Sequence, residues 1–132
     1  MKHIEFTVPY IPVKRRVRFT HAGRPYTDGK TRAEMRGVAR AFRNAGGKMH
    51  DGRVELSVTI CGKLPKSTPK RVESDHFTVK PDCDNVLKAV SDALNGIAYM
   101  DDANVTRVMA EKLPRIRREG ECTRVEVRWL DA

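Results

Sequence analysis

Strict alternation of apolar and polar residues constrains the fold of this chain more than any other feature of its sequence. In residues 53–60, apolar side chains occupy every second position and polar side chains lie between them. A period of two places the apolar residues on one face of a β-strand, so the pattern predicts a half-buried strand. Similar alternation predicts strands over residues 3–8 and 124–129. A weaker pattern predicts a fourth strand over residues 104–112, ended by Pro114.

Two other stretches repeat their apolar residues at helical spacing. Residues 31–44 form one such stretch, and residues 84–94 form the second, which Asn95-Gly96 ends. The order strand, helix, strand, helix, strand, strand favours an α+β fold with one mixed sheet and the helices packed on it. A chain of 132 residues can build one substantial core, so we expect a single domain over residues 1–132.

The connecting segments are long and basic. Residues 9–29 form a loop rich in Pro, Gly and cations, with a short hairpin expected around Ala22-Gly23, and residues 64–79 form another. Long loops in a small domain usually contact a ligand or a partner. The whole chain carries a formal charge of +9 and has a pI near 9.8. This charge favours a polyanionic partner such as nucleic acid, although it can also serve solubility alone.

Several classes of protein are disfavoured by the sequence. It contains no apolar run long enough to cross a membrane, and its first residues lack the apolar core of a secretory signal. The three cysteines are far apart in sequence and are expected to be free thiols, which indicates a reducing cytoplasm. No Cys or His spacing typical of zinc sites is present.

Acidic residues flank the second predicted helix. Asp82 and Asp84 precede it, and Asp101 and Asp102 follow the Asn95-Gly96 turn. A helical hairpin that doubles back would bring these carboxylates together, and converging carboxylates favour a hard cation such as Mg²⁺. The alternative is that Asp82 or Asp84 caps the helix and the other acid favours its dipole.

This arrangement resembles the signature of RusA-type Holliday junction resolvases. The resemblance runs from Lys80 to Gly96 and continues through Tyr99 to Asp102, so that one motif combines the acids, an Asn, a Lys and the helix length. The N-terminal part is similar to phage-type members in three segments: Pro12-Val13-Lys14-Arg15-Arg16-Val17-Arg18, Gly23-Arg24-Pro25-Tyr26-Thr27 and Lys30-Thr31-Arg32.

The resemblance implies a homodimeric endonuclease that cuts four-way DNA junctions symmetrically, in recombination and repair, with Mg²⁺ or the substitute Mn²⁺. It implies that Asp82, Asp84 and Asp102 hold the metal, assisted to a lesser degree by Asp101, and that Lys88 takes part in catalysis. The alternative for Lys88 is an ordinary ion pair one turn away on the helix. The implied fold is a small α/β domain with a mixed sheet, in agreement with the element order above.

The basic loop is expected to contact DNA phosphates through Lys14, Arg15, Arg16 and Arg18, although a solvated charge run is the alternative. Four aromatic residues are candidates for stacking on unpaired bases or, alternatively, for core packing: Tyr10, Phe19, Tyr26 and Phe77.

The chain departs from the family pattern at Cys83, which replaces an aliphatic residue, and at Val17, where phage-type members often have proline. Asp102 is also one residue displaced relative to some members. The sequence therefore favours a structure-selective endonuclease acting in the cytoplasm of a bacterial or phage-infected cell. The competing hypothesis is a noncatalytic DNA-binding protein on the same scaffold, or a nuclease of different selectivity.

Overall fold

A four-stranded mixed sheet organises the protein, as described by a computed structural model covering residues 2–131. Its strands are β1 (Lys2–Val8), β4 (Val54–Cys61), β6 (Val105–Lys112) and β8 (Cys122–Trp129), in the order β1-β8-β4-β6. β8 lies antiparallel to both β1 and β4, whereas β6 runs parallel to β4 and forms one edge. The predicted α+β fold with a mixed sheet is confirmed.

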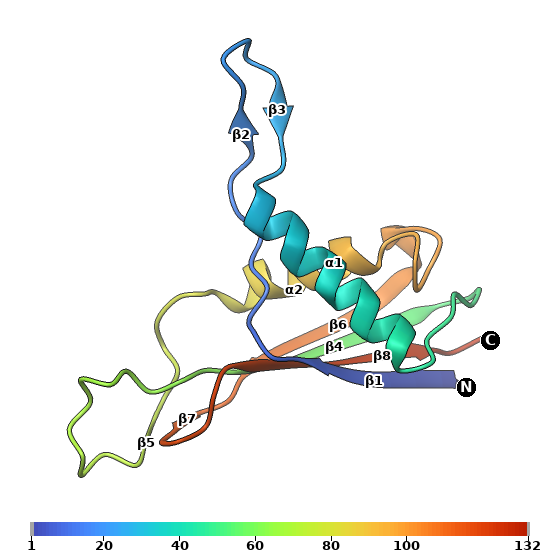
Figure 1. Ribbon diagram of the computed structural model, residues 1–132. Coiled ribbons are helices and arrows are strands. Elements are labelled where there is room, and N and C mark those ends of the chain that lie inside the picture. Colours follow the sequence, from blue (N-terminus) through green and yellow to red (C-terminus); the bar gives the residue numbers. More distant parts are fainter. Residues whose placement is uncertain (1, 132) are drawn as a thin grey trace.

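Two helices, α1 (Gly29–Asn44) and α2 (Cys83–Leu94), cover one face of the sheet (Figure 1). The connection from β4 to β6 passes through α2, and this crossover allows those two strands to be parallel. No helix of the described residues covers the opposite face. The predicted helices and all four predicted strands are present, with ends that differ by a few residues.

The core lies between the helices and the sheet because the alternating apolar side chains of the strands point toward α1 and α2. Phe42 of α1 packs edge-on against Phe6, with ring centroids 6.1 Å apart, and lies 6.1 Å from the Trp129 ring. Val8 of β1 is also fully buried, and the two central strands of the sheet contribute further fully buried residues to this layer: Val54, Leu56, Val58, Ile60, Val125 and Val127.

Two short two-stranded sheets lie outside this core. β2 (Arg18–Phe19) pairs with β3 (Pro25–Tyr26) in a hairpin that projects beyond the N-terminal end of α1 (Figure 1). It contains the Ala22-Gly23 turn expected from the sequence, and Gly23 has a φ of 80°. At the other side of the molecule, β5 (Ser74–Asp75) pairs with β7 (Arg115–Ile116).

The β5–β7 pair is held by cationic side chains. Arg115 forms a bidentate ion pair with Asp75, with contacts of 2.8 and 2.5 Å. Arg117 donates hydrogen bonds to the carbonyl oxygens of Val72 and Pro69. Arg115 therefore holds the long loop between β4 and α2 through a side-chain ion pair, and Arg117 holds it by satisfying backbone carbonyl groups.

Candidate functional site

The N-terminal end of α2 presents two carboxylates. Asp82 occupies the N-cap position with extended backbone angles, but its side chain makes no capping hydrogen bond. It pairs instead with Lys80 at 2.8 Å, and this hydrogen bond raises the pKa of Lys80. Asp84 lies exposed in the first turn, where its Oδ1 accepts the Asn85 backbone N–H at 3.0 Å. Helix capping by the Asp82 side chain therefore does not explain why an aspartate occupies position 82.

Asp102 lies at the opposite end of the same helix. It begins the short 3₁₀ helix η1 (Asp102–Asn104), which Asp101 caps by accepting the Ala103 N–H at 3.0 Å. Burial raises the pKa of Asp102, and repulsion from Asp92 and Asp101 raises it further, whereas Lys14 lowers it. Asp92 belongs to the last turns of α2 and is itself ion-paired with Lys14. Asp102 therefore belongs to an acidic group at the C-terminal end of α2.

Two observations establish the separation between the acidic groups. The 12 residues of α2 extend about 18 Å at the usual helical rise. β6 then runs back beneath the helix, and its last residue, Lys112, donates from Nζ to the carbonyl oxygens of Val79 and Pro81 at 2.6 and 2.9 Å. Because the end of β6 lies beside the start of α2, the start of β6 and Asp102 must lie at the far end.

The expectation that the chain doubles back to gather all the carboxylates is therefore wrong within one chain. The turn after α2 is tight: Gly96 N–H donates to the Tyr99 carbonyl at 2.8 Å, and the Tyr99 hydroxyl donates to the Ser91 carbonyl at 2.7 Å. This turn fixes residues 99–102 against the last turn of the helix. The chain then enters β6 directly, so Asp102 stays at the end of α2 where the turn places it.

Lys88 lies on the exposed surface of α2, one turn beyond Asp84. Among residues 2–131, it takes part in none of the ion pairs that the structure contains. The structure therefore does not contain the ion pair along the helix that was the alternative role for Lys88. Its ammonium group is available to an anionic ligand.

The basic residues expected to contact DNA differ in their surroundings. Arg15 forms a bidentate pair with Glu34 of α1, with contacts of 2.7 and 3.2 Å, and is half-buried. Arg18 pairs with Asp28 at 2.9 Å, and Lys14 pairs with Asp92. Arg16 is exposed and belongs to none of the ion pairs within the described part of the chain. Arg15 thus has a structural role in joining the basic loop to α1, while Arg16 is the freest of the four.

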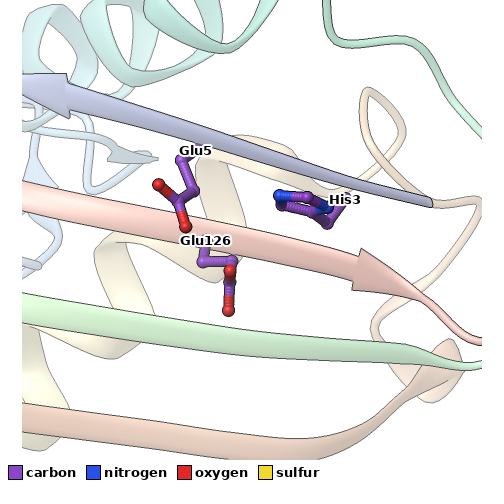
Figure 2. Close-up of side chains that lie close together, drawn as sticks. All are labelled: His3, Glu5 and Glu126. Atoms are coloured by element: carbon purple, nitrogen blue, oxygen red, sulfur yellow. The ribbon is translucent and has the colours of Figure 1, made fainter. Parts of the chain in front are cut away.

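A separate group of possible ligands lies on the uncovered face of the sheet (Figure 2). One ligand atom from each of His3, Glu5 and Glu126 lies within 4.8 Å of the other two, and within residues 2–131 this is the one such group found. Glu5 and Glu126 are directly opposite on β1 and β8, and Arg128 pairs with Glu126 at 3.2 Å. The sequence did not indicate this group, because strand pairing between distant segments creates it.

The cysteines also acquire a relationship that their sequence spacing conceals. All three are free thiols, but Cys61 and Cys122 lie directly opposite each other on β4 and β8. The Arg124 guanidinium donates to the Cys61 sulfur at 3.5 Å. No helix within residues 2–131 is long and apolar enough to span a bilayer.

The acidic group around Asp102 leads to a stability prediction. Because its folded-state pKa is raised above 3.8, ionised Asp102 opposes folding at neutral pH, and this penalty disappears as pH falls below the unfolded-state pKa. Asp102→Asn should therefore raise Tm at pH 7 by about 1–3 °C, a small shift because solvent screens exposed charges. The difference should vanish near pH 3. Thermal unfolding in EDTA measures both, with the exposed loop residue Asp51→Asn as the control. An unchanged or lower Tm at pH 7 would contradict the prediction.

Comparison with known proteins adds an independent observation. A family model described as endodeoxyribonuclease RusA matches residues 9–128, a range that includes both acidic groups and Lys88. Among curated proteins, the uncharacterized protein YqaN of Bacillus subtilis (strain 168) is 36% identical over 69 residues. That alignment covers 46% of this chain and 49% of YqaN, so the chain spans about half the length of this relative.

Proposed function

Because the chain belongs to the RusA family of endodeoxyribonucleases, we propose that it resolves four-way DNA junctions by paired, Mg²⁺-dependent phosphodiester cleavage. The observation that carries this proposal is the family match over residues 9–128. The Asp82 carboxylate, which is not used for helix capping, supports it, and so does the formal charge of +9, which suits a DNA substrate. The site of action is the cytoplasm of a bacterial or phage-infected cell.

The donor set at the start of α2 fits a hard cation. Asp82 is not used for capping and Asp84 is exposed, so both carboxylates can offer oxygen ligands of the kind that Mg²⁺ and Mn²⁺ accept. Such a cation supplies a more acidic bound water and charge stabilisation at the phosphate. Lys80 neutralises Asp82 in the free protein and would be released from it by the cation. Lys88, which is exposed one turn beyond Asp84, would stabilise negative charge on the phosphate.

The third carboxylate must come from elsewhere, because Asp102 lies at the far end of α2. We propose that the homodimer supplies it. β6 is an edge strand, and Val108 on its helix-facing side is 51% exposed. An uncovered edge strand with exposed apolar residues is a surface on which a second strand can pair. Met109 of β6 and Met100 just before it are also exposed.

Antiparallel pairing of two β6 strands about a two-fold axis would bring Asp102 of one subunit close to the start of α2 in the other. The eight residues of β6 extend about 26 Å, which is close to the length of α2 and its flanking residues. In such a pair, the start of the second β6 lies beside the end of the first, where Lys112 contacts Pro81. Asp102 of the partner subunit would then approach Asp82 and Asp84. The dimer would contain two identical sites, as paired cuts in a two-fold junction require.

A cleavage assay tests the proposed function. We expect the protein to nick a synthetic four-way junction in Mg²⁺ and to leave a linear duplex of the same sequences intact. The two products from opposite strands should appear at symmetric positions on a denaturing gel. Equal cutting of the linear duplex would reject junction selectivity.

The separation of Asp102 within one chain favours a second candidate, a noncatalytic DNA-binding protein on the same scaffold. On that hypothesis the two acidic groups never meet, and the basic surface alone is functional. Binding to the junction without cutting at any Mg²⁺ or Mn²⁺ concentration would support this candidate and reject the nuclease.

A further inference from the structure

The hairpin formed by β2 and β3 is an arm that projects from the body of the protein (Figure 1). We define the arm as residues 16–27. Its backbone is closed by hydrogen bonds from Thr20 N–H to the Arg24 carbonyl and from Gly23 N–H to the Thr20 carbonyl, each 2.9 Å. The arm belongs neither to the four-stranded sheet nor to the hydrophobic core.

The base of the arm is fixed to α1 by charged contacts. Before the arm, Arg15 forms its bidentate pair with Glu34, whose Oε1 also accepts the Val13 N–H at 3.2 Å. After the arm, Asp28 caps α1 by accepting the Lys30 N–H at 2.9 Å and pairs with Arg18. An isolated two-stranded hairpin is only marginally stable in water, so these contacts hold the direction in which the arm points.

The arm exposes aromatic rings to solvent. Phe19 is 66% exposed and Tyr26 is 41% exposed. The sequence offers four aromatic residues as candidates for either base stacking or core packing. Tyr10 and Phe77 pack against the core, whereas Phe19 and Tyr26 do not. The sheet and helices therefore give no structural reason for an aromatic side chain at position 19.

The charge of the arm identifies the kind of partner that these rings suit. The arm carries Arg16, Arg18 and Arg24 and contains no acidic residue. Arg16 and Arg24 belong to none of the ion pairs within residues 2–131. Exposed aromatic rings among guanidinium groups are the combination that binds unpaired bases, because the rings stack on the bases while the cations contact the phosphates.

We infer that the arm reads the branch point of the DNA, with the Phe19 ring stacked on a base that is unpaired at the junction centre. This inference rests on the proposed function. The interior of a linear duplex offers no exposed base face, whereas the centre of an open junction does. Stacking by Phe19 therefore favours the junction, while phosphate contacts from Arg16 and Arg24 add affinity for any DNA.

Fluorescence and binding measurements test this inference without requiring cleavage. Junctions with 2-aminopurine at each central position are titrated in EDTA with the wild type, Phe19→Ala, Phe19→Leu, Phe19→Trp and Arg24→Ala. We expect the wild type to change the fluorescence at one central position. Phe19→Ala and Phe19→Leu should abolish that change and weaken junction binding about tenfold, with duplex binding within about twofold of the wild type. Phe19→Trp should retain both properties. Arg24→Ala should weaken binding to junction and duplex equally.

The outcomes separate the arm from the nuclease. If Phe19→Ala or Phe19→Leu keeps the fluorescence change and the preference for the junction, the stacking role is wrong even where cleavage proceeds normally. If the wild type shows the expected Phe19-dependent change but never cuts DNA in Mg²⁺, the stacking role of Phe19 is supported and the proposed nuclease function is wrong. If the wild type binds neither junction nor duplex, both are rejected.

Discussion

Replacing Asp82 with Asn will lower the rate of junction cleavage by about a thousandfold or more, because losing a metal ligand removes several kcal/mol of transition-state stabilisation. Binding to the junction should persist, since the change removes a negative charge from a surface that faces phosphate. The fold should also persist, because the Asp82 side chain makes no capping hydrogen bond. Single-turnover cleavage and equilibrium binding in EDTA measure the two effects.

Asp51→Asn is the matched control for this experiment. Asp51 is an exposed aspartate in the loop before β4, so the same chemical change there should leave cleavage unaltered. Cleavage by Asp82→Asn at the wild-type rate would show that this carboxylate holds no catalytic metal. Loss of junction binding together with cleavage would instead indicate that Asp82 positions the DNA.

A dimer of one Asp82→Asn subunit and one Asp102→Asn subunit should regain cleavage that neither homodimer has. If each site takes Asp82 from one subunit and Asp102 from the other, the mixed dimer contains one intact site and one site with both substitutions. Coexpression with different affinity tags allows the mixed dimer to be purified. We expect it to nick one strand of the junction about a hundredfold faster than either homodimer or more, with half the wild-type number of active sites.

A mixed dimer of Asp82→Asn and Asp84→Asn subunits provides the control. Both residues lie at the start of α2, so each site in this dimer retains one damaged ligand and no activity should return. If the Asp82→Asn and Asp102→Asn mixture is equally inactive while the wild type cleaves, the shared site is wrong. Asp102 would then be required for a reason other than completing a site that contains Asp82 of the partner subunit.

Local physical chemistry explains the elements that could be predicted from the sequence. The alternation of residues 53–60 predicted β4, since a strand in a sheet covered on one face buries every second side chain. The helical spacing of residues 84–94 predicted α2, and its bounds of Cys83–Leu94 differ by one residue. The Ala22-Gly23 turn was also readable, because the positive φ of Gly23 suits glycine.

The sequence motif suggests which acids to consider as site residues, but it does not predict how they are arranged. The sequence predicts the turn after α2, and a turn that ends the helix favours the return of Asp102 to the start of α2. That expectation is wrong because β6 is parallel to β4 and must therefore start at the C-terminal end of α2. Asp102 comes directly before β6, so it lies at that end of the helix too. Likewise, four cations in the basic loop looked equivalent, yet Glu34, 19 residues beyond Arg15, gives that residue a structural contact.

The sequence by itself determined the secondary structure, the basic character and the acidic motif around α2, because each depends on residues a few positions apart. Only the tertiary structure decided where those acids lie, since the position of Asp102 depends on the parallel pairing of β6 with β4, about 50 residues earlier in the chain. The same holds for the direction of the arm, which is set by ion pairs to α1. Distances between distant segments follow from strand pairing and packing, which no local pattern encodes.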